Sequence, residues 1–199
     1  MEPIHIKNFL PKQVSTILYQ YCLIKFSRPE WRPQVINRID KQTDCLAWVK
    51  DDDLMQTILD LSTPVVEQNV NKKLYPTYSY LRVYEKGTDL RPHTDRKACE
   101  YTVALCIGSS PNDEPYNLFM GSLDESQDYQ YLDMGNIMHK FKIEHKIPVS
   151  VNDAVIFQGI DKLHWREKCN HDHYITVFLH YVDQEGKYAD QKFDGNNGL

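Results

Sequence analysis

The first third of the chain carries apolar residues at helical spacing. Between Pro11 and Lys25 they recur three or four positions apart, and Pro11 suits the first turn of a helix. A second stretch of the same period follows three aspartates at 51–53, whose charges favour a helix start, and continues to Val66. Pro64 removes a backbone donor there and predicts a kink or a break. We therefore expect amphipathic helices in this region.

From about residue 78 onward the pattern becomes typical of strands. Several short runs either alternate apolar with polar residues or are rich in β-branched and aromatic residues. They cover 80–84, 101–107, 141–147, 154–157 and 174–181. The stretch 109–136 is polar and holds two prolines, so it predicts loops. Helices followed by short strands predict an α+β protein in which the helices pack on one face of an antiparallel sheet assembly. A double-stranded β-helix, that is, a cupin-like jelly roll, fits the strands.

Length and charge limit the choices further. With 199 residues, 41% of them hydrophobic, we expect one domain over 1–199, with a helical support region at 1–77, a catalytic core at 78–182 and a C-terminal tail at 183–199. A net charge of −5 disfavours a nucleic-acid partner. No apolar run is long enough for a signal segment or a membrane span, so we expect a soluble, cytoplasmic protein. The five cysteines include no Cys-x-x-Cys pair, so we expect them to be reduced thiols.

Candidate chemistry centres on His93 and Asp95, which lie two positions apart between strand-like runs. On an extended segment, side chains two positions apart point the same way, with Cα atoms about 6.6–6.8 Å apart, so both can coordinate one metal ion. A shuffled sequence with 8 histidines and 28 acidic residues contains about one such pair, so the strand context carries the argument. His164, after a further apolar run, is the best-placed third ligand. Two histidines and one carboxylate suit non-haem Fe(II) with open positions.

With these residues in place, the chain from about residue 78 to 182 resembles the iron(II)- and 2-oxoglutarate-dependent oxygenases, in the branch similar to prolyl 4-hydroxylases. The shared features are a strand ending at Tyr84, a glycine-containing turn, His93 with Asp95, a further strand, the run 151–157 leading to His164, and a last strand. The resemblance implies that His93, Asp95 and His164 bind Fe(II), with 2-oxoglutarate as cosubstrate and O2 as oxidant. Succinate and CO2 are then released. Asp95 favours hydroxylation, because halogenating members carry a small residue there.

The cosubstrate has a second carboxylate, which calls for a buried cation. Members of the family often carry Arg or Lys about ten residues after the distal histidine, but this chain has Tyr174 there, followed by Thr176 on the same strand face. Arg166, two residues after His164, is our first substitute, since guanidinium geometry matches a carboxylate. These three side chains, Arg166, Tyr174 and Thr176, are therefore expected at the cosubstrate.

Arg82 is the rival anchor. It shares a strand face with Tyr84, whose hydroxyl would assist if that face lines the barrel. For Arg166 the alternative is an ion pair with Glu167 or another carboxylate.

The expected function is that of a 2-oxoglutarate-dependent dioxygenase that hydroxylates a C–H bond of a protein side chain, a peptide or an amino acid. Whether the substrate is a small molecule or a polypeptide is left open by the sequence, as is the oligomeric state. The alternative is a non-catalytic cupin-like module that binds a metal or ligand. The missing basic residue on the last strand favours that alternative.

Overall fold

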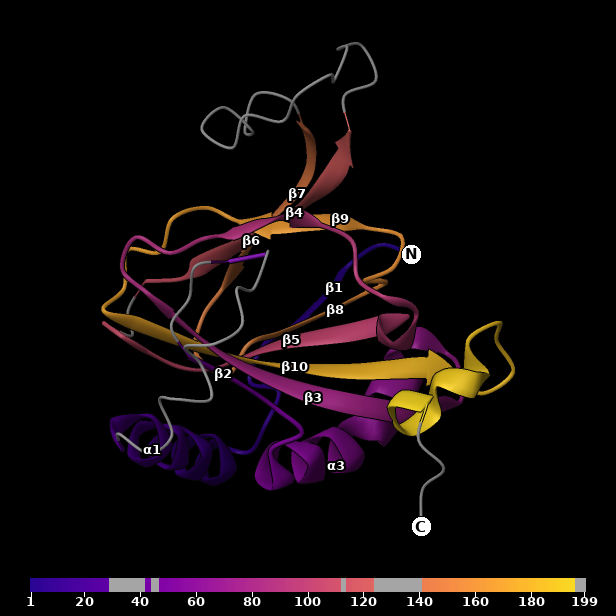
Figure 1. Cartoon of the computed structure of the whole chain (residues 1–199), viewed down its shortest axis with the longest axis horizontal. Helices are drawn as coiled ribbons and strands as arrows, with labels where there is room; N and C mark the ends of the chain where they lie inside the picture. Colours follow the sequence, from indigo (N-terminus) through magenta and orange to yellow (C-terminus); the bar gives the residue numbers. More distant parts are fainter. Residues whose placement is uncertain (29–41, 44–46, 112–113, 124–140, 196–199) are drawn as a thin grey trace.

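A computed structural model describes residues 1–28, 42–43, 47–111, 114–123 and 141–195, which form a pair of antiparallel sheets that face each other (Figure 1). The large sheet has the order β1-β8-β5-β10-β3-β2 and the small sheet the order β4-β9-β6-β7. The large sheet contains β1 (Ile4–Ile6), β2 (Ala47–Lys50), β3 (Leu74–Glu85), β5 (Tyr101–Ser110), β8 (Ala154–Phe157) and β10 (His173–Asp183). The small sheet contains β4 (Leu90–His93), β6 (Tyr116–Leu123), β7 (Phe141–Val149) and β9 (Leu163–Arg166). We call the space between the two sheets the barrel.

Helices α1 (Lys12–Ser27) and α3 (Asp53–Val70) lie on the outer side of the large sheet (Figure 1). Asp52 caps α3 by accepting hydrogen bonds from the backbone N–H groups of residues 54 and 55, both at 3.1 Å. The helix runs unbroken through Pro64, so the predicted break is absent. Its buried side chains, among them Met55 and Val66, pack on the sheet and outweigh the lost backbone hydrogen bond.

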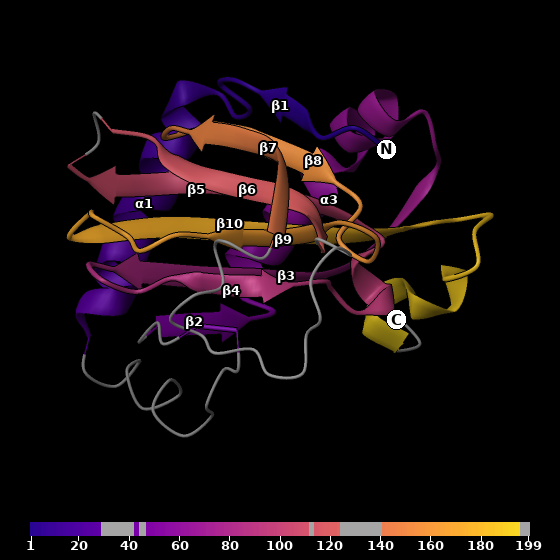
Figure 2. The same cartoon turned by 90° about the horizontal axis from the view of Figure 1, so that it is seen from above.

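The large sheet is apolar on both faces. Along β5, Val103 and Leu105 belong to the core under the helices, whereas Ala104 and Cys106 belong to the core inside the barrel. This explains why the sequence reads as a continuous apolar run rather than as an alternating one. Seen from above, β4, β9 and β6 lie over β3, β10 and β5 (Figure 2). The small sheet thus closes the barrel from the other side.

The predicted α+β class with a double-stranded β-helix core is confirmed, as are the expected helices and strands. The part of the loop expectation for 109–136 that falls on 112–113 and 124–136 lies outside the described residues. The expectation is wrong for Tyr116–Leu123, which forms β6. Its alternate residues Tyr116, Leu118 and Met120 are buried inside the barrel, a period-two signal that the surrounding polar residues obscured.

The remaining described elements lie at the ends of the sheets. The region 1–77 supplies the edge strands β1 and β2 as well as helices. Short 3-10 helices occur at Lys97–Cys99 and, with an internal kink, at Ala189–Gly195. Among the described residues, no helix has the length and apolar character needed to cross a bilayer.

Candidate metal centre

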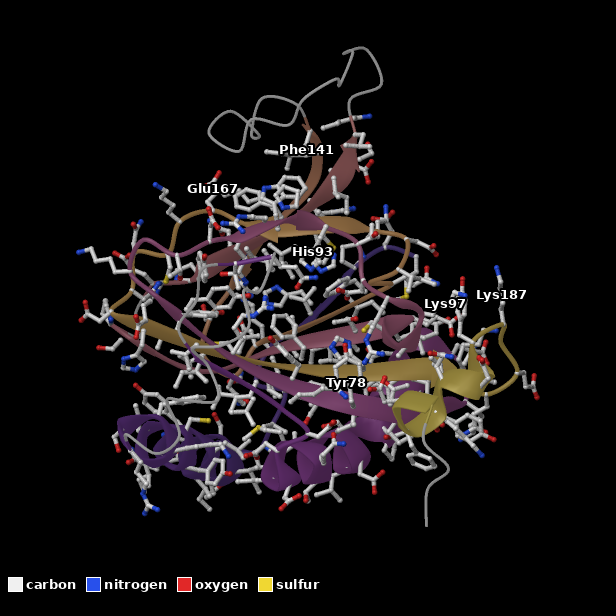
Figure 3. The ribbon with its side chains drawn as sticks, viewed as in Figure 1. Tyr78, His93, Lys97, Phe141, Glu167 and Lys187 are labelled. Carbon is white, nitrogen blue, oxygen red and sulfur yellow. The ribbon has the colours of Figure 1, made fainter. Side chains whose placement is uncertain are left out.

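Three predicted ligands come together at one end of the barrel. His93 ends β4, His164 lies directly opposite on β9, and Asp95 follows two residues after His93. Oδ1 of Asp95 lies 3.5 Å from Nε2 of His93 and 3.7 Å from Nε2 of His164. The two imidazole rings are 4.2 Å apart between centroids, and His93 points to the inner side of the small sheet (Figure 3). We call these residues the His-Asp-His triad.

Backbone carbonyl groups orient both histidines. Nδ1 of His93 donates to the carbonyl of Arg91 at 2.7 Å, and Nδ1 of His164 donates to the carbonyl of Lys162 at 2.8 Å. Since a carbonyl oxygen only accepts, Nδ1 carries the proton and the lone pair of Nε2 faces the shared space. Burial lowers the pKa of His164 to about 4, so that ring is neutral near pH 7, as a metal ligand must be.

The donor set of the triad fits a metal ion. Nitrogen and oxygen ligands about 2.1 Å from one ion are about 3.0–3.6 Å apart, close to the distances in the triad. Two imidazoles and one carboxylate on a single face leave the opposite positions open, which is the arrangement of non-haem Fe(II) sites. The triad residues can therefore hold iron with room for further ligands.

Arg166 lies in the barrel, two residues beyond His164 on the same strand. Its side chain is only 1% exposed, and Nη1 donates to the carbonyl of Tyr116 at 2.5 Å. Within the described residues, Nε and Nη2 have no hydrogen-bond partner and no carboxylate pairs with the guanidinium, so the alternative ion pair with Glu167 is not formed there. The N–H groups of Nε and Nη2 lie along one edge of the group, the edge that binds a carboxylate through two parallel hydrogen bonds.

Three tyrosine rings surround this guanidinium. Its carbon lies 4.8 Å from the ring centroid of Tyr116, 5.2 Å from that of Tyr174 and 5.9 Å from that of Tyr84. Cation–π contacts of this kind stabilise a buried cation without neutralising it. The hydroxyl of Tyr174 donates to the carbonyl of Val149 at 3.0 Å, which fixes that ring. Arg166 is thus held in place with one edge available.

Arg82 also lies inside the barrel, on the face of β3 that carries Tyr84. Its Nη1 donates to the hydroxyl of Tyr84 at 3.3 Å, and its guanidinium carbon lies 5.0 Å from the Tyr80 ring centroid. Thr176 is directly opposite Arg82 in the sheet and fully buried, and its hydroxyl has no partner among the described residues. All five residues expected at the cosubstrate therefore lie on the barrel strands β3, β9 and β10.

The sequence did not point to Tyr116, whose carbonyl tethers Arg166. It lies on β6, in the stretch expected to form loops, and only the alternation of Tyr116, Leu118 and Met120 could have placed it on the inner face.

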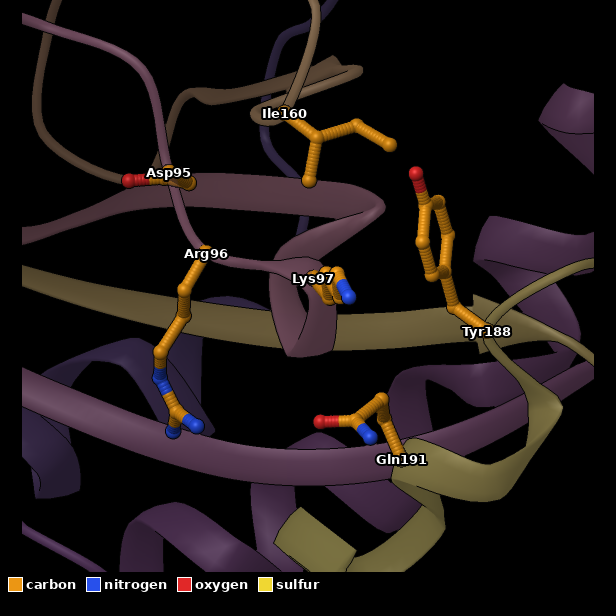
Figure 4. A pocket seen from close by; sticks show the side chains of 6 residues that line it. All are labelled: Asp95, Arg96, Lys97, Ile160, Tyr188 and Gln191. Carbon is orange, nitrogen blue, oxygen red and sulfur yellow. The ribbon is translucent and has the colours of Figure 1, made fainter.

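A cavity of about 470 Å³ lies beside Asp95 (Figure 4). Its lining residues are Asp95, Arg96, Lys97, Ile160, Tyr188 and Gln191. Tyr188 and Gln191 come from the C-terminal region, which carried no signal of its own in the sequence. The cavity places open space next to a residue of the triad.

Comparisons with known proteins support the same fold. No protein-family model and no curated protein sequence matches the chain. Among solved structures, it is similar to the carbocyclase SnoK of nogalamycin biosynthesis, a non-haem alpha-ketoglutarate-dependent enzyme, with a TM-score of 0.67 and 14% identity over 99% of this chain and 89% of that one. A Pseudomonas putida prolyl-4-hydroxylase gives 0.57 and 13% over 89% and 91%. A Trichoplax adhaerens prolyl hydroxylase with a hypoxia inducible factor peptide fragment gives 0.57 and 18% over 92% and 84%.

The chain therefore has the double-stranded β-helix fold of the iron- and 2-oxoglutarate-dependent oxygenases, and prolyl hydroxylases are among its structural neighbours. The resemblance seen in the sequence is confirmed at the level of the fold.

Proposed function

We propose that this protein is an Fe(II)- and 2-oxoglutarate-dependent oxygenase that hydroxylates a C–H bond of a protein side chain, a peptide or an amino acid. One observation carries the proposal. The His-Asp-His triad and a guanidinium edge without a partner among the described residues face the same barrel, and His164 of the triad lies two positions before Arg166 on β9. The triad suits the metal, and the guanidinium edge of Arg166 suits a carboxylate.

The triad residues would hold the iron. With 2-oxoglutarate and dioxygen, iron supplies the oxidising chemistry that breaks the C–H bond of the substrate, while the cosubstrate becomes succinate and CO2. The neutral imidazole of His164 packs edge-on against Phe157, with ring centroids 4.8 Å apart, which fixes its plane. These residues would orient the metal and exclude water from one side of it.

His164 and Arg166 lie two positions apart on β9, so their side chains leave the strand on the same face. Residues two apart on a strand are about 6.6–6.8 Å apart at Cα. The extended five-carbon chain of 2-oxoglutarate measures about 5 Å between its carboxylate carbons, from C–C bonds of about 1.5 Å. One end can therefore reach the triad while the far carboxylate accepts two hydrogen bonds from Arg166. Thr176 offers a hydroxyl donor in the same barrel.

Arg82 would border the cosubstrate rather than anchor it. Its Nη1 is engaged with the hydroxyl of Tyr84 and its Nη2 with Oε1 of Gln42 at 3.4 Å, so these groups already have acceptors. Arg166 instead offers a complete fork. On this proposal the anchor that is missing from the last strand comes from β9, and the free fork of Arg166 weighs against the non-catalytic alternative.

The cavity beside Asp95 is our candidate for the substrate. Lys97, Tyr188 and Gln191 offer hydrogen-bond donors there, and Ile160 offers an apolar surface (Figure 4). Among the structural neighbours, one binds a peptide fragment and another belongs to nogalamycin biosynthesis, so the fold accommodates both polypeptides and small molecules. A substrate in this cavity would approach the metal from the side of Asp95.

The test is the visible absorption of the purified protein with Fe(II) and 2-oxoglutarate under anaerobic conditions. We expect a charge-transfer band that His93→Ala abolishes. His145→Ala is the matched control, because His145 pairs with Glu2 at 3.3 Å outside the triad, and it should retain the band. After oxygen is admitted, succinate should form. A band without succinate, even with candidate peptides and amino acids present, would support the non-catalytic module, and no band despite metal binding would refute the cosubstrate assignment.

A further inference from the structure

We propose that Thr102 and His180 are positioning residues that hold one oxygen of Asp95 away from the metal. The proposal rests on the metal site of the proposed function and goes beyond it, because neither residue belongs to the triad. It concerns how the carboxylate is presented to the ion. Its support comes from the two oxygens of Asp95, which have different surroundings.

Oδ1 of Asp95 faces the triad, where it lies within 3.7 Å of both Nε2 atoms. The hydroxyl of Thr102 lies 3.2 Å from Oδ2 and 3.4 Å from the carbonyl oxygen of Cys99, and it donates to Oδ2, which is nearer and carries the charge. Thr102 is fully buried at the start of β5. The two oxygens of the Asp95 carboxylate therefore differ: Oδ1 faces the triad, and Oδ2 is hydrogen-bonded to Thr102.

His180 completes a chain of hydrogen bonds. Its Nδ1 lies 3.1 Å from the hydroxyl of Thr102, its direct cross-strand neighbour on β10. A hydroxyl has one proton, so if Thr102 donates to Asp95, its oxygen accepts from Nδ1–H of His180. The Tyr78 ring, 4.4 Å away between centroids, fixes the imidazole.

Gly159 lies against the carboxylate of Asp95 as well. The backbone N–H of Asp95 donates to the carbonyl of Gly159 at 2.8 Å. A Cβ at position 159 would lie 2.7 Å from the hydroxyl of Thr102 and would overlap Oδ2 of Asp95. Only glycine leaves room for the carboxylate here. Asp95 is thus confined between a backbone wall and the hydroxyl of Thr102.

This arrangement has a consequence for the metal. A carboxylate can bind an ion through one oxygen or through both. If both oxygens of Asp95 bound, they would occupy a position that the cosubstrate or dioxygen needs. With Oδ2 held by Thr102, Asp95 would bind a metal ion through Oδ1 alone and would leave that position free for another ligand. The Thr102–His180 pair thereby fixes both the direction and the number of ligand atoms.

The test uses Co(II) alone as the probe. Thr102→Val removes the hydroxyl at nearly constant volume, and Thr102→Ser keeps it. Loss of an outer hydrogen bond to a metal ligand typically costs about 10- to 100-fold in metal affinity. We expect that loss for Thr102→Val by calorimetric titration, together with a changed Co(II) d–d spectrum, and an affinity within about threefold of the wild type for Thr102→Ser.

His180 is tested in the same way. His180→Leu should weaken Co(II) binding like Thr102→Val, and His180→Asn, which retains an N–H near the position of Nδ1, should recover most of the affinity. The double variant Thr102→Val/His180→Leu should bind no more weakly than Thr102→Val, because both changes break one chain. Thr77→Val is the control, since Thr77 is a buried threonine whose hydroxyl donates to the carbonyl of Ala98 at 2.7 Å.

The melting temperature of each metal-free variant separates positioning from folding. Co(II) affinity should fall in Thr102→Val although the metal-free protein melts within a few degrees of Thr77→Val. Wild-type affinity in Thr102→Val, or equal losses in Thr102→Val and Thr102→Ser, would overturn the proposal. His93→Ala tests the metal site itself. If it binds Co(II) as tightly as the wild type, the proposed function fails independently of Thr102.

Discussion

Replacing Arg166 by methionine is expected to abolish tight binding of 2-oxoglutarate while leaving the protein folded. The guanidinium is fully buried, and its Nε and Nη2 groups have no hydrogen-bond partner among the described residues. Methionine fills a similar volume and keeps the apolar contacts with the surrounding tyrosine rings. The substitution thus removes the carboxylate fork with little loss of packing.

The magnitude follows from the two free N–H groups. Each hydrogen bond to a charged partner contributes about 1.5–3 kcal/mol, so the pair contributes about 3–6 kcal/mol. At about 1.4 kcal/mol per tenfold change, the dissociation constant should rise about 100- to 10,000-fold. The ligand-free protein should lose less than about 2 kcal/mol, because removing a buried unpaired charge offsets the lost bond from Arg166 to the carbonyl of Tyr116.

Calorimetric titration of 2-oxoglutarate into the Mn(II)-loaded protein measures the dissociation constant. Urea denaturation of the metal-free protein measures the change in the free energy of unfolding. Arg166→Lys keeps the charge but not the fork, so it should fall between the wild type and Arg166→Met. A dissociation constant for Arg166→Met within threefold of the wild type would refute the reasoning. If Arg82→Met shows the large loss instead, the anchor lies on β3. If neither variant changes binding, the barrel does not hold the cosubstrate through an arginine.

Two further predictions concern stability. Burial lowers the pKa of His164 and His180 to about 4, below the unfolded value, so the unfolded chain takes up protons first as the pH falls. The metal-free protein should therefore lose about 2 kcal/mol per histidine between pH 7 and pH 5, measured by urea denaturation, and a flat profile would contradict the burial of these rings. Lys25→Met breaks the buried ion pair between Nζ and Oδ2 of Asp52, 2.5 Å apart, and should cost about 3–5 kcal/mol. The exposed change Lys12→Met on the same helix should stay within about 0.5 kcal/mol, and equal effects of the two would argue against the pair.

Periodicity predicted most of the fold because burial repeats along each element. The α1 and α3 segments show one apolar face to the sheet, and the β-rich runs fill both faces of it. The break that was one of the two expectations at Pro64 and the loop expected at Tyr116–Leu123 were mispredicted, because local signals competed with tertiary packing. In α3 the buried face outweighs one missing hydrogen bond. In β6 the inward residues alternate over only a few positions between polar neighbours.

The triad was predictable because His93 and Asp95 share a short extended segment and His164 follows a strand. The surroundings of Asp95 were not. Thr102, His180 and Gly159 come from three distant stretches, and only the cross-strand register places them at one carboxylate. His180 lies late on the last strand, and its Nδ1 matters for Asp95 only because Thr102 lies directly opposite.

The cosubstrate anchor that we propose, Arg166, illustrates that residues far apart in the sequence of a barrel can lie close together in space. Strand β9 of the small sheet and strand β10 of the large sheet face each other across the barrel, so side chains from either can reach the same point. Tyr174 holds the place where a basic residue was expected, and its ring centroid lies 5.2 Å from the guanidinium carbon of Arg166. The guanidinium of Arg166 therefore lies close to Tyr174 although it comes from the opposite sheet, and the ring of Tyr174 makes a cation–π contact with it. A search for a basic residue along the last strand alone would therefore miss Arg166. Binding a carboxylate in the barrel requires a guanidinium at the right point in space, and it does not require an arginine at a fixed number of residues after His164.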